Sequence, residues 1–189
     1  KRLRVQSPNT EIVFFTTMPT LQILYNEDFS TYHLAGRKKH REMTASEWNA
    51  MVEENLSLVL NQHKPKMFIF DGAFPYRGML IAIRSRDRIE KVWVRRGMFR
   101  KGSNIPVDSI EHFTSIVRPG DGGDVDEHLK VDISVQSHTV SPMLLMNHDE
   151  VLTKEQASAR LNLPDGSKIV YVQLGAGRIN DIDSEIRLT

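Results

Sequence analysis

The 189-residue sequence contains no cysteine. This absence excludes a disulfide framework, a thiolate nucleophile, and any zinc or iron–sulfur site with cysteine ligands. The sequence also has no apolar run of the roughly 20 residues that a membrane-spanning helix requires. We therefore expect a soluble globular protein, and a cytoplasmic location agrees with the lack of cysteine.

Excess charge of one sign is absent as well. The 25 Lys and Arg residues nearly balance the 24 Asp and Glu residues, which leaves a formal net charge of +1. No general electrostatic attraction to nucleic acid is therefore predicted. Hydrophobic residues make up 40% and charged residues 26% of the chain, which is typical of a globular domain and not of a disordered one.

The sequence also lacks an initiating methionine, and it opens with two apolar residues among three basic ones (1–5). This pattern is typical of the last turn of an amphipathic helix, where cations are favoured. An apolar strand follows at 11–16, and another strand is predicted at 169–174, near the other end. Both ends therefore predict a fragment, which lacks a first strand and most of a second domain. Residues 11–16 would then have an open strand edge, and self-association through that edge is expected.

Apolar runs alternate with helical patterns along most of the chain. Strands are predicted at 11–16, 67–71 and 91–95 and a helix at 44–63, which begins at a capping box of Thr44 and Glu47. Strand–helix alternation predicts an α/β fold with one parallel, doubly wound, Rossmann-like sheet and right-handed crossovers. The helix at 44–63 is expected on one face of this sheet.

The pattern changes after Gly97. A further short strand is predicted at 115–120 and an extended segment at 139–145. A helix then begins at Thr153, with Gln156 three residues later as the second half of a capping box. We expect a Rossmann-like domain at 1–148, followed at 149–189 by a linking helix and the beginning of a second α/β domain.

Ligands of open parallel sheets bind beyond the carboxyl ends of the strands. Asp71 follows the strand at 67–71 and can accept a hydrogen bond from a sugar hydroxyl, orient a base, or cap the next helix. Arg95 and Arg96 follow the strand at 91–95 and, with Arg100 and Lys101, form a basic cluster. Such a cluster can hold a phosphate or lie on the solvated surface.

A glycine-containing turn follows the strand at 169–174. The amides of Gly175 and Gly177 can approach a diphosphate there, but the third glycine position of a dinucleotide fingerprint is Asn180. The D-x-D patterns at 124–126 and 181–183 are short enough to arise by chance, and no histidine pair has zinc-ligand spacing. Neither a metal nor a bound cofactor is predicted.

Five segments together resemble bacterial glycosyltransferases of the GT-B fold, and more narrowly the group containing the N-acetylglucosaminyltransferase of peptidoglycan synthesis. They are the strand at 11–16, FDGAFPYRG at 70–78, WVRRGMF at 93–99, RPGD at 118–121 and VQLGAGRIND at 172–181. The resemblance implies two Rossmann-like domains that face a cleft. The acceptor would bind to the first domain and a nucleotide-sugar, UDP-linked in this group, to the second.

The resemblance further implies transfer of a sugar from a nucleotide diphosphate to an acceptor hydroxyl, without a tightly bound metal. Four residues would line the acceptor side: Asp71, Tyr76, Arg95 and Arg96. Four would lie near the donor diphosphate: Gly175, Gly177, Arg178 and Asn180. The serine often found in the donor turn is absent here, so Arg178 and the backbone would make that contact. The usual candidate base would precede Lys1, so the fragment alone is expected to be inactive. Peripheral membrane contact is open for the parent protein.

Two other interpretations stay open at this point. A nucleotide-sugar epimerase shares the two-domain fold, and a non-catalytic α/β binding module would have the same sheet without the chemistry. The sequence names neither the sugar, the acceptor nor the stereochemical outcome. A complete G-x-G-x-x-G, which an oxidoreductase of this fold would need, is not present.

Overall fold

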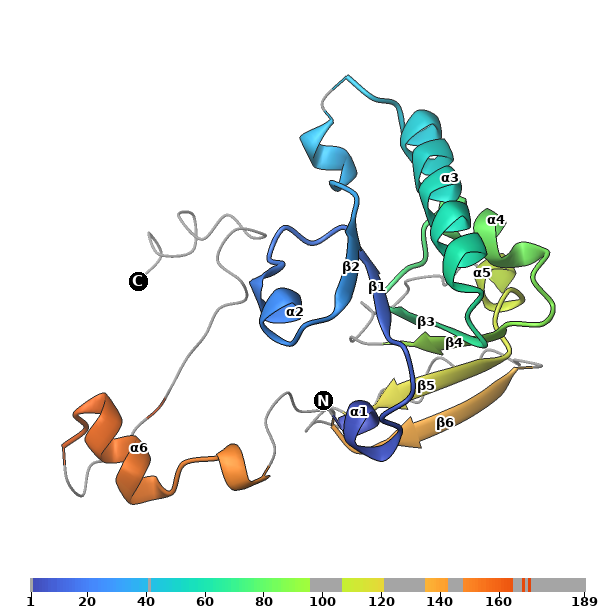
Figure 1. Ribbon diagram of the computed structural model, residues 1–189. Helices are drawn as coiled ribbons and strands as arrows, with labels where there is room; N and C mark the ends of the chain where they lie inside the picture. Colours follow the sequence, from blue (N-terminus) through green and yellow to red (C-terminus); the bar gives the residue numbers. More distant parts are fainter. Residues whose placement is uncertain are drawn as a thin grey trace. The chain divides into compact units, whose positions relative to one another are not determined.

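The computed structural model describes residues 2–40, 42–95, 107–120, 135–142 and 148–164, together with residues 168 and 170 (Figure 1). The chain divides into two compact units, 1–143 and 144–189. The first unit holds all of the described strands. It contains the elements that position the candidate site.

The first unit has helices and strands in alternation, beginning with the short helix α1. Its helices are α1 (Arg2–Gln6), α2 (Gln22–Asn26), the 3-10 turn η1 (Arg37–Lys39), α3 (Ala45–His63), α4 (Arg77–Arg84) and α5 (Val107–Ile110). Its strands are β1 (Val13–Thr16), β2 (Ser30–His33), β3 (Met67–Asp71), β4 (Glu90–Val94), β5 (Ser115–Pro119) and β6 (Gln136–Val140). The second unit holds the 3-10 turn η2 (His148–Glu150) and α6 (Lys154–Leu161).

Four strands form a wholly parallel sheet in the order β3-β4-β5-β6. The predicted parallel pairing of 67–71 with 91–95 is confirmed, since Met67 lies opposite Glu90 and Asp71 opposite Val94. The strand order follows the sequence along the sheet. The described strands therefore show an α/β fold with a parallel sheet flanked by helices, while the reversal of a doubly wound sheet and the GT-B arrangement stay predictions.

The prediction of one continuous sheet is wrong for the described residues. There β1 pairs only with β2, in a separate two-stranded parallel sheet, and not with β3. The physical reason is that an apolar run indicates a buried strand but does not specify its partner, and the ladder of β1 runs from Val13 opposite Ser30 to Thr16 opposite His33. The apolar side chains of β1 are nevertheless half-buried: Phe14 lies edge-on to Phe29 at 5.0 Å, and Phe15 packs against the main core.

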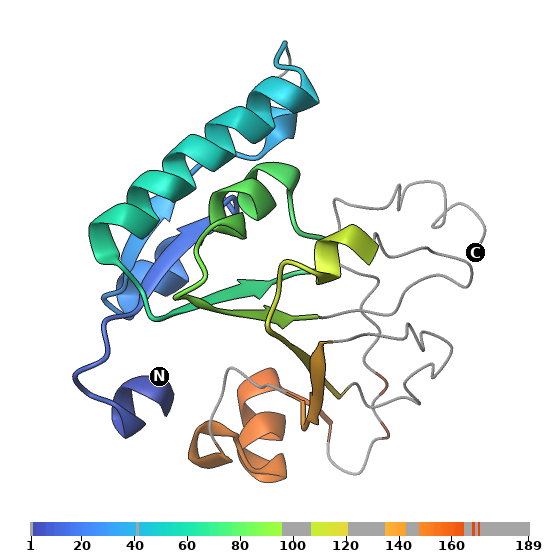
Figure 2. The ribbon, with the colours of Figure 1, turned by 90° about the vertical axis from the view of Figure 1, so that its right-hand side faces the viewer.

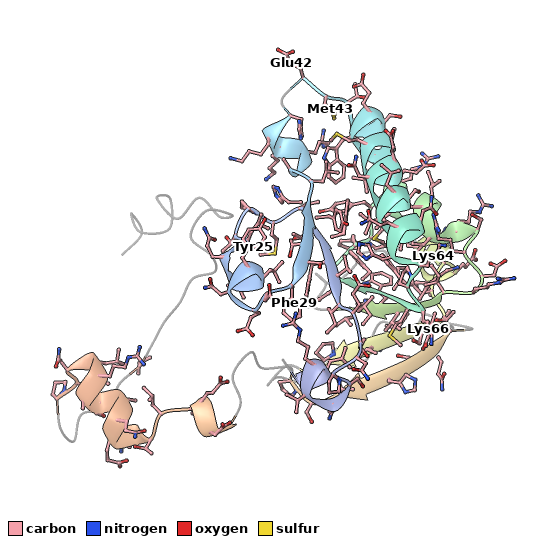
Figure 3. The ribbon with its side chains drawn as sticks, viewed as in Figure 1. Tyr25, Phe29, Glu42, Met43, Lys64 and Lys66 are labelled. Atoms are coloured by element: carbon pink, nitrogen blue, oxygen red, sulfur yellow. The ribbon has the colours of Figure 1, made fainter. Side chains whose placement is uncertain are left out.

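The long helix α3 begins and ends as its sequence dictates. The hydroxyl of Thr44 accepts from the amide of Glu47 at 3.2 Å, and the Glu47 carboxylate accepts from the amide of Thr44 at 2.8 Å. These bonds with Thr44 lower the pKa of Glu47 because they favour its charged form. The helix ends at Lys64, whose φ of 46° is left-handed, before Pro65 (Figure 3).

The core lies between β3–β5 and the helices α3 and α4, which lie side by side (Figure 2). Trp93, Ile83 and Ile116 are fully buried at its centre. Gly78 allows the two helices to approach closely, because a Cβ at this position would overlap the carbonyl oxygen of Asn49. The amide of Gly78 also donates to Oδ1 of Asn49 at 2.8 Å. The residues that α3 buries are Trp48, Val52, Leu56, Val59 and Leu60, and four of them belong to the main core cluster.

Polar contacts tie α3 to the two-stranded sheet as well. The ring of His63 lies between the hydroxyl of Tyr32, 2.9 Å from Nε2, and the carboxylate of Glu11, 2.9 Å from Nδ1. At the other end of α3, Nε1 of Trp48 donates to the carbonyl oxygen of Ala35 at 3.1 Å. One helix thus anchors both sheets. The contact joins the last residue of α3 to Tyr32 of β2 and to Glu11, which precedes β1.

The second unit contains the predicted capping box, in which Thr153 and Gln156 satisfy each other's amides at the start of α6. The strand predicted at 169–174 lies, apart from Val170, outside the described residues. In the part of the chain that the structure describes, no helix has the length and apolarity needed to cross a bilayer.

Replacing Thr44 with Ala should lower the free energy of unfolding by about 1 kcal/mol, because the Glu47 amide loses its acceptor at the start of α3. Urea denaturation followed by circular dichroism measures the change. Ser46→Ala, at an exposed position in the same turn, is the control and should stay within about 0.5 kcal/mol of the parent. Equal losses in both variants would contradict the capping role.

Candidate ligand site at the carboxyl edge of the sheet

The carboxyl edge of the main sheet brings together charged residues from three neighbouring strands. Asp71 ends β3 and lies opposite Val94, which in turn lies opposite Val117 of β5. Arg95 and Arg118 each follow these valines by one residue, so they share a register position on adjacent strands. The ladder continues to this point, because the amide of Arg95 donates to the carbonyl oxygen of Val117 at 2.9 Å.

Arg95 is buried although it is charged. Only 6% of its surface is exposed, and its guanidinium carbon lies 6.0 Å from the centre of the Trp93 ring. Burial, and secondarily the positive charge of Arg118, lower the pKa of Arg95 to about 10. The guanidinium is still charged at neutral pH. The alternative of a solvated basic loop is therefore wrong for Arg95.

Arg118 is a member of this site that the sequence prediction left out. In the sequence, Arg118 is the first residue of the RPGD segment. Its side chain is half-buried, and its Nε is out of contact with solvent. Within the described residues, that Nε has no hydrogen-bond partner. A clue was available in the sequence: Arg118 follows an apolar strand just as Arg95 does, and aligned parallel strands place such residues side by side.

Asp71 is exposed at the end of β3. Of the three roles considered for it, capping of the next helix is not what the structure shows: the N-cap of α4 is Tyr76, without a side-chain cap bond. Asp71 lies opposite Val94, one residue before Arg95. Because successive residues of a strand alternate between the two faces, Asp71 and Arg95 lie on different faces at the same edge. Acceptance from a sugar hydroxyl and orientation of a base both stay predictions for its carboxylate.

Tyr76 lies in the loop between β3 and α4, at the same edge of the sheet. Its ring stands edge-on to that of Trp48, with centroids 4.8 Å apart and an interplanar angle of 83°. The loop is held at its beginning, where Nε1 of Trp93 donates to the carbonyl oxygen of Gly72 at 2.8 Å. Tyr76 is 43% exposed, so one side of the ring is open to a ligand while the other is fixed.

The other predicted site residues lie outside the described residues. These are Arg96 on the acceptor side and the donor-side set of Gly175, Gly177, Arg178 and Asn180. Both D-x-D patterns, 124–126 and 181–183, fall there too. Among the residues that the structure does describe, no group of three or more His, Asp and Glu could hold a metal ion.

Comparison of the chain with known protein families, with curated proteins and with solved structures finds no match. The fold and the edge residues therefore define the class of protein only as α/β with a parallel sheet. The resemblance to GT-B glycosyltransferases stays a prediction from the sequence segments.

Proposed function

We propose that this protein is a glycosyltransferase that moves a sugar from a nucleotide diphosphate, with UDP as the nucleotide, to an acceptor hydroxyl. The observation that carries the proposal is the position of Arg95, with Asp71 and Tyr76, at the carboxyl edge of a parallel sheet. That edge is where sheets of this kind bind ligands. The segments that resemble glycosyltransferases include these same residues.

In this proposal the two units divide the substrates between them. Asp71, Tyr76, Arg95 and Arg96 contact the acceptor, where a carboxylate and an aromatic face suit a sugar hydroxyl and ring. The turn after Leu174 holds the donor diphosphate through backbone amides, since successive N–H groups form an anion-binding concavity. Arg178 and Asn180 add side-chain donors there. No resident metal is part of the proposal.

An assay of UDP-glucose and UDP-N-acetylglucosamine turnover tests the proposed reaction. A glycosyltransferase releases UDP at a rate that rises when a hydroxyl acceptor is supplied. An epimerase instead changes the sugar while UDP stays attached or is released without need for an acceptor. A binding module turns over neither donor. Acceptor-independent epimerisation, or saturable donor binding with no turnover for any acceptor, would contradict the proposal.

Replacing Gly177 with Val should weaken UDP-sugar binding by about tenfold or more, because a branched side chain prevents close approach of the diphosphate to the backbone. Calorimetric titration with UDP-N-acetylglucosamine measures the loss. Ala176→Val, at the neighbouring position of the turn, is the control for general disruption and should have a smaller effect. Unchanged affinity in Gly177→Val would show that the donor site is elsewhere.

The remaining predictions about partners follow from the same proposal. Transfer between a soluble donor and a hydroxyl acceptor agrees with action in the cytoplasm, and an acceptor held in a membrane would require peripheral contact by the protein. Self-association is also proposed, through the edge of β1 that pairs with no other strand among the described residues, since such an edge can pair with another copy. Sedimentation of the chain at increasing concentration would detect it.

A further inference from the structure

Three polar side chains form a hydrogen-bonded row between α3 and the two-stranded sheet. The hydroxyl of Tyr32 lies 2.9 Å from Nε2 of His63, and Nδ1 of the same ring lies 2.9 Å from Oε1 of Glu11. Tyr32 belongs to β2, His63 is the last residue of α3, and Glu11 precedes β1. None of the three is among the residues assigned to the acceptor or the donor. The row therefore requires an explanation that is independent of the proposed function.

The fold holds both rings of the row in place. Tyr32 lies opposite Phe15 in the β1–β2 ladder, so the two side chains share one face of this sheet, and Phe15 packs against the main core. The rings of Tyr32 and His63 stand edge-on, with centroids 5.6 Å apart and an interplanar angle of 75°. Tyr32 is half-buried, while the side chains of His63 and Glu11 are 15% and 62% exposed. The row is thus fixed by packing at one end and open to solvent at the other.

The chemistry of the three groups determines the direction of both hydrogen bonds. An ionised carboxylate has no proton to donate, so Nδ1 of His63 donates and Glu11 accepts. In a neutral ring the other nitrogen, Nε2, is then an acceptor, and the hydroxyl of Tyr32 donates to it. The proton of Tyr32 therefore points at a base, and Glu11 holds that base in the tautomer that can take the proton.

We propose that Tyr32 is a nucleophile that accepts an acyl group from an activated acyl donor, with His63 as its general base and Glu11 as the positioning residue. Hydroxyl nucleophiles are activated by a base within about 2.6–3.2 Å, which a third group orients in turn. Oη of Tyr32 forms a bond to the acyl carbon, and its proton moves to Nε2 of His63. The bond from the acyl carbon to the leaving group then breaks, and the leaving group takes the proton from Nε2. The product is an O-acyl tyrosine.

An acyl donor suits the charges of the row better than a phosphoryl donor does. The carboxylate of Glu11 is a negative charge within hydrogen-bond distance of the base, and it repels the charged oxygens of a phosphoryl group. The reacting carbonyl of a thioester or an acyl imidazole is uncharged. We therefore assign the reagent of Tyr32 to the class of activated acyl compounds.

Acetylation of the 189-residue chain by N-acetylimidazole, followed for each tyrosine by peptide mass spectrometry, tests the proposal. Tyr32 should react about tenfold or more faster than Tyr25 and Tyr76, because a general base accelerates a reaction by about 10²–10⁴-fold and outweighs the partial burial of the ring. Tyr25 and Tyr76 are 57% and 43% exposed, so exposure alone would make them react first. Acetylation of either one before Tyr32 would overturn the proposal.

Removal of the base gives the sharper comparison. His63→Gln should slow acetylation of Tyr32 about a hundredfold and leave that of Tyr25 unchanged. His138→Gln, which removes an exposed histidine from β6, is the matched control and should leave both rates unchanged. Circular dichroism shows whether each variant is folded.

Substitutions of Glu11 distinguish positioning of the base from a purely structural contact. Glu11→Gln keeps the size of the side chain but not the charge that stabilises a protonated His63, and should slow acetylation of Tyr32 about tenfold or more. Glu11→Asp keeps the charge and should slow it less. Because Glu11 is exposed, these variants carry the test if His63→Gln is not folded.

A purely structural contact predicts the opposite sign for the same substitutions. Loss of the contact would free the hydroxyl of Tyr32 and expose it to the reagent, so acetylation would become faster. Unchanged or faster acetylation of Tyr32 in the folded His63→Gln and Glu11→Gln variants would therefore overturn the proposal.

Discussion

Gly78→Ala should be among the most damaging single substitutions in the chain, lowering the free energy of unfolding by about 3 kcal/mol or more. The new Cβ would overlap the carbonyl oxygen of Asn49, which belongs to the backbone of α3 and cannot rotate away. Overpacking of a core costs about 1–3 kcal/mol, and a backbone neighbour places this case at the upper end. Alanine gains only about 1 kcal/mol over glycine from helix propensity, so the steric cost decides the sign.

Urea denaturation of Gly78→Ala and of a matched Gly36→Ala variant measures this difference. Gly36 has a φ of −61°, and a Cβ there would meet the Thr17 carbonyl oxygen at an ordinary 3.8 Å. Its replacement by Ala should therefore leave stability within about 0.5 kcal/mol of the parent. Gly78→Ala as stable as Gly36→Ala would mean that α3 and α4 are not packed as closely as described.

Trp93→Ala should cost about 3–5 kcal/mol, which is enough to unfold a marginally stable domain. The indole is fully buried, and its ring packs at 5.4 Å from Phe113 and 6.1 Å from Phe70. Its Nε1 also holds the carbonyl oxygen of Gly72, at the start of the loop that carries Tyr76. The substitution therefore removes core packing and an anchor of the candidate site at once.

Trp93→Phe separates these two roles. It keeps an aromatic ring in the core but leaves the Gly72 carbonyl without its donor, so the loss of stability should be smaller, about 1–3 kcal/mol. Phe113→Leu, which reduces core volume at a residue next to the indole, is the comparison. A larger loss of stability in Trp93→Phe than in Phe113→Leu would support the anchoring role. Equal losses in the two variants would limit Trp93 to packing.

Local features of the fold could be predicted because they rest on neighbouring residues. The capping boxes at Thr44 and Thr153, the strands at 67–71 and 91–95 and their parallel pairing all follow from short sequence patterns. The bounds of α4, Arg77–Arg84, are less predictable, since helix ends depend on caps that periodicity does not show. The extended segment placed at 139–145 is instead a strand at Gln136–Val140, paired with β5.

Features that depend on distant partners could not be predicted in the same way. Separation of β1 and β2 from the main sheet is set by pairing, which apolar runs do not specify. Burial of Arg95 depends on the elements that cover it, and its pattern in the sequence is that of an exposed loop. The alignment of Arg95 with Arg118 depends on the register of β4 and β5. In that register Val92 lies opposite Ser115, which follows it by 23 residues in the chain.

The most direct test of the proposed function is a set of calorimetric titrations with UDP-N-acetylglucosamine, using the unmodified protein, Gly177→Val and Arg118→Gln. The proposal assigns the donor and the acceptor to different surfaces. We therefore expect Gly177→Val to weaken donor binding about tenfold or more and Arg118→Gln to leave it unchanged. The reverse pattern, in which donor binding survives Gly177→Val and is lost in Arg118→Gln, would contradict the assignment of the carboxyl edge of β4 and β5 to the acceptor.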